Sequence, residues 1–239
     1  MSRAKHIINR TAILLLLLAQ WVGLNAQEVD RVNVAENAEY LYGPEIELVQ
    51  GEKYFYPYNL VKGDPFFEYI STGETVLWIE GKPYKGYSLK YDVYTQLLVL
   101  EYKDKDRTPV SIVLGNERID RFNMGGKEFR KFRLDEDGEK FGQVAYEGEM
   151  TCLFFWYKVM DYEMVGGEKI EAFSPQRCKR CILKNGEFHS FRNKRSFLRI
   201  LSEEQRMVIK PVIRQYRIRM RKVSDGTMHL LMTTLEDKE

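Results

Sequence analysis

The chain has 239 residues, of which 44% are apolar and 13% aromatic, and this composition is that of a folded globular protein rather than a disordered one. Its 37 Lys and Arg nearly balance its 35 Asp and Glu, which excludes a uniformly polybasic or polyacidic chain. Three cysteines are too few for the dense disulfide framework of small secreted domains, so the fold must rest on its core. One domain with a small appendage is expected at this length.

Residues 1–26 have the pattern of a secretory signal peptide. Basic residues precede an apolar run over residues 12–19, and small Ala26 fits the cleavage rule. Because Gln20 and Gly23 interrupt the apolar stretch, it falls short of the roughly 20 residues that a membrane-spanning helix needs. We therefore expect an exported protein of the periplasm or outer envelope, or one secreted from the cell, with no transmembrane helix after cleavage. An uncleaved membrane anchor is the alternative.

Residues 39–192 have the pattern of antiparallel β-strands, because short β-branched and aromatic runs alternate with turn residues. Alternating side chains over residues 84–91 predict a half-buried strand. Three nearly continuous apolar runs predict strands covered on both faces: residues 97–100, 110–114 and 152–159. We expect a mainly β domain over residues 27–193, built as an antiparallel sheet or a half-barrel.

The strongest hairpin signal is Asn185-Gly186, because both central residues of a type I′ turn need a positive φ. This turn sets a register that pairs Leu183 with Phe188, Ile182 with His189 and Cys181 with Ser190. Cys181 and His189 are therefore expected on opposite faces of the sheet.

After Asn193 the period of the apolar pattern changes to that of helices, so residues 194–239 are expected to form a helical segment packed on the sheet. Ser202 and the acidic residues after it predict a capped helix start, and this helix should run to Tyr216 or beyond. Pro211 should kink or divide the helix. Shorter helices are expected at residues 197–201 and 227–235.

The C-terminal third of the chain concentrates positive charge. Residues 175–222 hold 15 Lys and Arg against three Glu, a formal charge of +12. A basic stripe of this kind could meet anionic lipid headgroups, lipopolysaccharide phosphates or an acidic envelope protein. Docking on the protein's own acidic sheet, or simple solvation, is the alternative, and nucleic acid is not expected for an exported chain. The stripe on the long helix consists of Arg206, Lys210, Arg214, Arg217 and Arg221.

The cysteines favour structural rather than catalytic roles. Cys178 and Cys181 are flanked by basic residues, but the second of them leads into a hairpin and not into a helix, unlike a redox-active CxxC motif. A structural disulfide between these two, or between one of them and Cys152, is one interpretation, and unpaired buried thiols are the other. A zinc site would also need His189 or His229, and the spacing matches no standard pattern, so no metal or cofactor is expected.

No sequence pattern selects a catalytic site. The nucleophile elbow, the P-loop and the dinucleotide fingerprint are all missing from the sequence. The acidic residues 135–137 fit a turn better than a calcium loop. Aromatic residues near the start of the β region could stack on a glycan or pack as core: Tyr40, Tyr42, Tyr54, Phe55, Tyr56, Tyr58, Phe66, Phe67 and Tyr69.

Four segments together carry a resemblance: residues 81–92, 97–100, 119–122 and 193–198. Over most of its length the chain resembles a family of uncharacterised exported β-rich envelope proteins of Gram-negative bacteria. The resemblance implies a periplasmic or outer-envelope address and no catalytic residue, ligand or cofactor. We therefore expect a non-enzymatic binding or structural protein of the envelope, and a carboxylate-based hydrolase acting on envelope glycans is the alternative.

Overall fold

The computed structural model describes residues 48, 51–68, 75–104, 106–134 and 138–237. The predicted leader, the acidic turn at residues 135–137, and Tyr40, Tyr42 and Tyr69 lie outside this part of the chain. Contacts divide the chain into two units: Met1–Glu47 with Lys103–Pro109, and Leu48–Tyr102 with Val110–Glu239. In the described part of the first unit, the Asp104 carboxylate accepts from the backbone N–H groups of Asp106 and Thr108. The sheets and helices of the described residues belong to the second unit, apart from the strand ends at Lys103 and Pro109.

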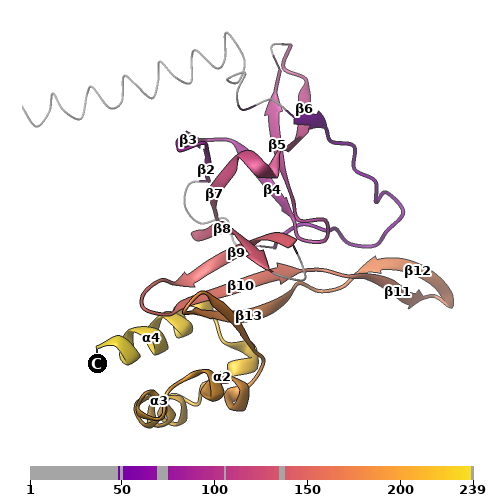
Figure 1. Cartoon of the computed structure of the whole chain (residues 1–239). Coiled ribbons are helices and arrows are strands. Elements are labelled where there is room, and N and C mark those ends of the chain that lie inside the picture. The colour runs from indigo at the N-terminus through magenta and orange to yellow at the C-terminus, as the bar shows by residue number, and fades with distance from the viewer. Residues whose placement is uncertain (1–47, 49–50, 69–74, 105, 135–137, 238–239) are drawn as a thin grey trace, which may run out of the picture. The chain divides into compact units, whose positions relative to one another are not determined.

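The fold is mainly β, with antiparallel sheets and a C-terminal helical segment, as the sequence predicts (Figure 1). The larger sheet has the order β14-β13-β10-β9-β8-β7-β2-β3, and a smaller one has the order β1-β6-β5-β4. The strands of the larger sheet are β2 (Val76–Ile79), β3 (Lys82–Lys85), β7 (Ile119–Met124), β8 (Lys127–Leu134), β9 (Gly138–Tyr146), β10 (Thr151–Tyr157), β13 (Arg177–Lys184) and β14 (Glu187–Phe191). Those of the smaller sheet are β1 (Gly51–Lys53), β4 (Ser88–Asp92), β5 (Leu97–Lys103) and β6 (Pro109–Leu114), and β11 (Met160–Val165) pairs with β12 (Glu168–Phe173).

One hydrophobic core joins strands of both sheets. The Tyr91 side chain on β4 is fully buried among Phe122, Phe129 and Phe141 of the larger sheet, with ring centroids 5.5 to 6.0 Å away. Its hydroxyl donates to Gln96 Oε1 at 2.6 Å, so the buried polar atom is paired. Aromatic burial of this extent accounts for the stability of a β domain without disulfides.

The predicted strand over residues 84–91 is wrong. It is divided into β3 and β4, which belong to different sheets, because Gly86 lies between them with a φ of +80°. Tyr84 is buried together with Leu89 and Tyr91, although strict alternation would place Tyr84 on the other face. A single glycine therefore resets the periodicity of the pattern.

Of the three apolar runs predicted to be buried on both faces, two are confirmed in part and one is not. Residues 98–100 of β5 and 152–155 of β10 are consecutively buried, which confirms strands covered on both faces. In β6 only Ile112 and Leu114 are buried, so this strand is half-exposed, and β10 ends at Tyr157 instead of reaching Val159.

The hairpin between β13 and β14 is confirmed in register. Leu183 pairs with Phe188, and Ile182 with His189. Asn185 and Gly186 have φ values of +52° and +80°, which is the conformation that their turn type requires.

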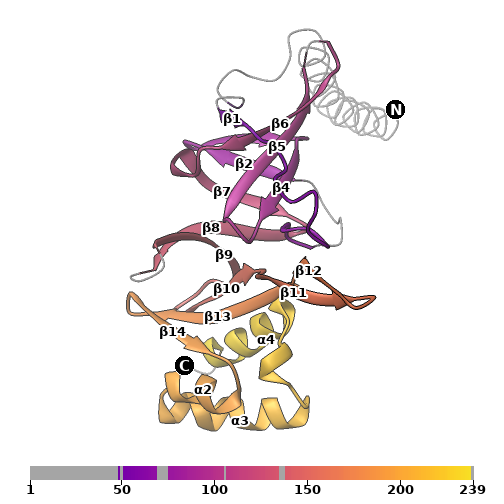
Figure 2. The same cartoon turned by 90° about the vertical axis from the view of Figure 1, so that its right-hand side faces the viewer.

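The C-terminal segment is helical from Lys194 onward and covers one face of the larger sheet (Figure 2). The long helix continues through Pro211, so the predicted division there is wrong. No helix in the described residues is both long and apolar enough to cross a membrane. The helical elements are α2 (Lys194–Ile200), α3 (Glu203–Gln215) and α4 (Asp225–Glu236), with short 3-10 turns η1 (Asn116–Arg118) and η2 (Met220–Lys222).

Candidate functional site

Two capped helices, α2 and α3, frame the main candidate site. The Asn193 side chain accepts from the backbone N–H of Ser196, and Ser202 accepts from that of Gln205. Both starts are capping boxes, and the one at Ser202 confirms the sequence prediction. The caps fix where each helix begins, and therefore which residues of α2 face α3.

Arg206 joins the two helices. Its Nε donates to the carbonyl oxygen of Leu198 at 2.6 Å, and its terminal nitrogens reach Arg199 O and Glu203 Oε2. These carbonyls lie in the last turn of α2, where backbone acceptors lack partners within the helix. Arg206, predicted as a ligand-binding residue, therefore has its donors engaged in holding α2 against α3.

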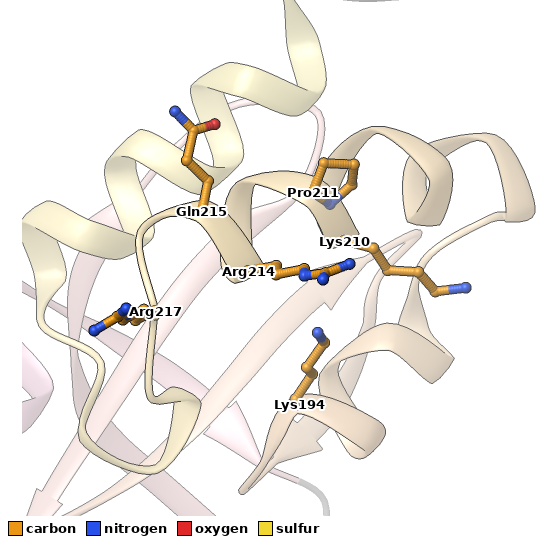
Figure 3. A pocket seen from close by; sticks show the side chains of 6 residues that line it. All are labelled: Lys194, Lys210, Pro211, Arg214, Gln215 and Arg217. Atoms are coloured by element: carbon orange, nitrogen blue, oxygen red, sulfur yellow. The ribbon is translucent and has the colours of Figure 1, made fainter.

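A hollow of about 970 Å³ opens between α2 and α3. Figure 3 shows Lys194 of α2 and Arg214 of α3 pointing toward one another, with Lys210 beside them. A second, adjoining hollow shares Lys194 and Lys210. We call the two together the α2–α3 groove, which is lined by Lys194, Arg195, Leu198, Arg199, Arg206, Lys210, Pro211, Arg214, Gln215 and Arg217.

Among the described residues, Arg206 is the one cation of the α2–α3 groove with a carboxylate partner, Glu203. The side chains of Lys194, Lys210, Arg214 and Arg217 are exposed, and no described carboxylate lies within ion-pair distance of them. Residues 194–222 hold ten Lys and Arg against two Glu, a formal charge of +8. Clustered like charges repel one another, so a bound anion would lower the free energy of this surface.

The predicted stripe is only partly a helix face. Lys210 and Arg214 follow one another on α3, but the helix ends at Gln215 and Arg217 has a φ of +48° in the turn beyond it. Arg217 still lines the groove, whereas Arg221 lies on η2 and does not. The sequence prediction also misses Lys194, which reaches the groove from a different helix.

Met207 adds an apolar side chain to the basic face. It is 63% exposed and precedes Lys210 and Arg214 by three and seven residues, a spacing that places all three on one side of α3. Tyr216, which caps the C-terminal end of the same helix, is 61% exposed. Exposed apolar groups beside cations are typical of helices that lie on anionic membranes.

The predicted disulfide between Cys178 and Cys181 is wrong in this structure. Both lie on extended strand β13 three residues apart, and all three cysteines are free thiols. A spacing of three residues in a strand puts the two Cα atoms roughly 10 Å apart on opposite faces, beyond the reach of a disulfide. Cys178 packs on the helix side with Cys152, and Cys181 packs on the other face with Leu153.

The thiols should remain protonated well into alkaline solution. Burial raises the pKa of Cys178 to about 12 and that of Cys181 to about 11, from an ordinary value of 9.0. Since the unfolded chain loses these protons first, the free energy of unfolding should fall as the pH rises from about 9 to about 12. Thiolate absorbance at about pH 10 should be low in the native protein and high in urea. Equal absorbance in the two states would contradict buried thiols.

The histidines do not join the cysteines. His189 Nε2 lies 3.7 Å from Glu187 on the same hairpin, and the His229 ring packs edge-on against Tyr146. Over the ranges that the structure describes, no group of three or more His, Cys, Asp or Glu side chains is arranged to hold a metal ion.

The predicted aromatic surface is largely packed on itself. Tyr56 stacks on Phe66, and the Tyr58 ring contacts Tyr94 and Phe173 edge-on with centroids 6.0 and 5.0 Å away. Phe55 is the most exposed ring of this region, at 72%. These side chains act mainly as an aromatic cluster between loops and β12, which leaves little ring surface open for stacking on a sugar.

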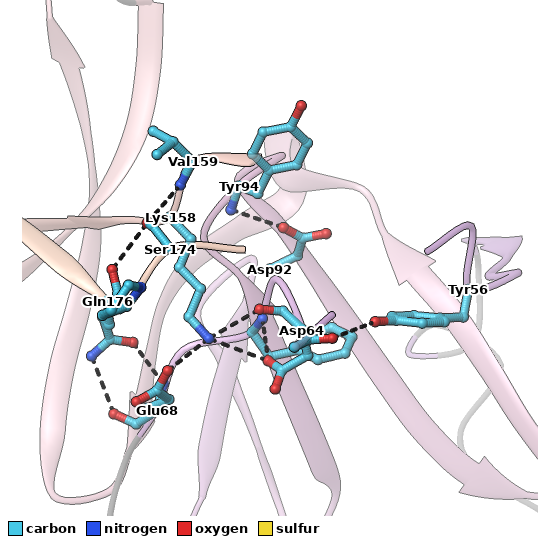
Figure 4. A network of polar contacts seen from close by, with 12 residues as sticks. Tyr56, Asp64, Glu68, Asp92, Tyr94, Lys158, Val159, Ser174 and Gln176 are labelled. Carbon is cyan, nitrogen blue, oxygen red and sulfur yellow. Dashed lines mark hydrogen bonds and ion pairs between the residues drawn. The ribbon is translucent and has the colours of Figure 1, made fainter. Parts of the chain in front are cut away.

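Beside this cluster lies a buried lysine (Figure 4). Lys158 Nζ donates to the backbone oxygen of Asp64 at 3.0 Å, and lies 3.4 Å from the Asp64 carboxylate and 2.8 Å from that of Glu68. Gln176 accepts from the Glu68 backbone N–H at 2.6 Å. These contacts hold residues 64–68 against the end of β10, so we assign Lys158 a role in stabilising the fold.

Comparison of the chain with protein-family models, with curated proteins and with solved structures finds no match in any of the three. Function must therefore be inferred from the residues themselves. The α2–α3 groove combines a large open hollow with a lining in which none of the described residues is a carboxylate.

Proposed function

We propose that this is an exported, non-enzymatic protein of the bacterial envelope that binds an anionic phospholipid surface through the α2–α3 groove. The single observation that carries the proposal is that Lys194, Lys210, Arg214 and Arg217 line one open hollow, and that none of its described lining residues is a carboxylate. Guanidinium groups match the geometry of phosphate oxygens, and ammonium groups add charge attraction.

A lipid surface suits this site better than an enclosed ligand. The groove is open and its basic side chains are exposed, so a headgroup can approach without rearrangement of the fold. Met207 lies on the same face and can enter the boundary between headgroups and acyl chains. The leader pattern of residues 1–26 and the resemblance to exported envelope proteins support an address where such a surface is available.

The lining of the α2–α3 groove does not support the alternative of a carboxylate-based hydrolase. A carboxylate-based glycosidase needs two facing acids in a cleft, about 5 to 9.5 Å apart. In the part of the chain that the structure describes, no Asp or Glu lines the α2–α3 groove, and Asp64 and Glu68 are engaged with Lys158.

Vesicle binding by the exported chain, beginning at Gln27, tests the proposal. Neutralising Lys210, Arg214 and Arg217 together to Gln should weaken binding to phosphatidylglycerol vesicles by about a hundredfold. This magnitude follows from about 1 kcal/mol for each basic residue near an anionic surface. Binding by the unaltered chain should weaken as salt rises, and vesicles of phosphatidylcholine alone should not bind.

A matched control is available on η2 and the residue before it. Neutralising Arg219, Arg221 and Lys222 removes the same charge from exposed positions outside the groove. This control should bind at least tenfold more tightly than the groove variant. Equal losses in the two variants would show that net charge, and not the groove, governs binding, and equal binding to neutral vesicles would contradict the proposal altogether.

A further inference from the structure

Another hollow, outside the α2–α3 groove, lies where β10, β13 and β14 meet the start of α2. Its volume is about 580 Å³, within the roughly 300–1,000 Å³ that small-molecule sites occupy. We call it the seam pocket. One part of its lining is apolar or aromatic and consists of Leu134, Phe155, Trp156, Tyr157 and Phe191.

The rest of the seam pocket is strongly basic. Among the residues that the structure describes, five cationic side chains line it, and no Asp or Glu does. It shares Arg199 with the α2–α3 groove and is otherwise lined by different residues, so it is a separate site. The five cationic residues are Lys140, Lys179, Arg180, Arg192 and Arg199.

Arg180 has a donor that nothing in the described chain uses. Its guanidinium carbon lies 5.5 Å from the centroid of the Phe154 ring, which holds the group over an aromatic face. Its Nε is buried and has no hydrogen-bond partner among the described residues. A buried N–H without a partner costs free energy, so an acceptor that enters the pocket would be favoured there.

Two other polar groups of the pocket lining already have hydrogen-bond partners. The Trp156 indole N–H donates to Gln143 at 2.9 Å, which leaves the ring as a wall. The Ser196 hydroxyl accepts from the Arg192 and Asn193 backbone N–H groups. A ligand in this pocket could therefore use the free Arg180 donor and pack against the Trp156 ring.

We propose that the seam pocket binds a small amphiphilic anion, with its acidic group at Arg180 and its apolar or aromatic body against Trp156. The site is independent of the phospholipid surface proposed for the α2–α3 groove. Its ligand class is set by the unused donor of Arg180, the aromatic walls and a volume that suits one small organic molecule.

Anilinonaphthalene sulfonate is a suitable probe, because it joins an aromatic body to one anionic group. In a Trp78→Phe background of the chain beginning at Gln27, Trp156 is the single tryptophan and reports on the pocket by energy transfer to the bound probe. We expect saturable binding of one probe per chain. Arg180→Gln should weaken it roughly tenfold. N-phenylnaphthylamine, which lacks the sulfonate, should bind much more weakly.

A second pocket variant and a control variant outside the pocket complete the test. Arg192→Gln, at an exposed position, should also weaken probe binding without affecting folding, whereas the triple variant of Lys210, Arg214 and Arg217 should leave it unchanged. Urea unfolding of the Arg180 variant shows whether its native state is retained. Unchanged binding in both the Arg180 and Arg192 variants, or equal binding of the uncharged probe, would overturn the proposal.

Discussion

Phe197→Ala is expected to lower the free energy of unfolding by about 4 kcal/mol, a large effect for a single substitution. The Phe197 side chain is fully buried, and its ring centroid lies 5.1 Å from that of Phe191 at the end of β14. It anchors α2 in the core between the sheet and the helices. Removal of the ring leaves a cavity that the surrounding helices can fill only in part. Urea unfolding followed by circular dichroism measures the change.

Leu230→Ala provides the matched control for this prediction, because Leu230 on α4 is a large apolar residue that is 47% exposed. Its truncation should change the free energy of unfolding by less than about 1 kcal/mol. The Phe197 variant should also bind anionic vesicles less well, since Lys194 depends on the position of α2. A loss of stability no larger than that of Leu230→Ala would contradict the packing of α2 on the sheet.

Neutralising Asp64 and Glu68 should lower the free energy of unfolding by more than replacing Lys158 does. The lysine side chain is 3% exposed, whereas those of Asp64 and Glu68 are 53% and 63% exposed. Asp64→Asn with Glu68→Gln leaves a buried ammonium without a counter-charge, which should lower the free energy of unfolding by about 3 kcal/mol. Lys158→Met leaves two carboxylates that water can solvate, and should cost less than about 1 kcal/mol.

The three substitutions together supply the decisive comparison. Because the penalty arises from the unpaired buried charge, adding Lys158→Met to the variant without the two acids should restore most of the lost stability. Asn at position 64 can still accept from the Phe66 backbone N–H, as Asp64 does at 2.8 Å, so the local turn is preserved. A further loss of stability in the triple variant would show that packing, and not charge, dominates at this site.

Local signals in the sequence predict local structure well. Asn185-Gly186 sets the register of its hairpin, and Ser202 marks the start of α3, because each depends on side chains only two or three residues away. The interruption at Gly86 escapes prediction, since the alternation of side chains continues across a glycine whose positive φ is visible only in three dimensions. The mainly β class follows from many such local patterns together.

The candidate site depends on tertiary structure and is therefore only partly predictable. Lys210 and Arg214 follow from the periodicity of one helix, but Lys194 joins them from another helix across the groove. Arg206 fits the same periodicity and is instead engaged with the end of α2. The burial of Lys158 brings together residues about a hundred positions apart, which no local pattern records.

The most direct test of phospholipid binding in the α2–α3 groove is a crystal structure of the chain from Gln27 onward with a short-chain phosphatidic acid. We expect the lipid phosphate to lie between the Lys194 ammonium and the Arg214 guanidinium, with Lys210 beside it. A structure in which the phosphate is bound elsewhere and the groove contains only water would contradict lipid binding at this site.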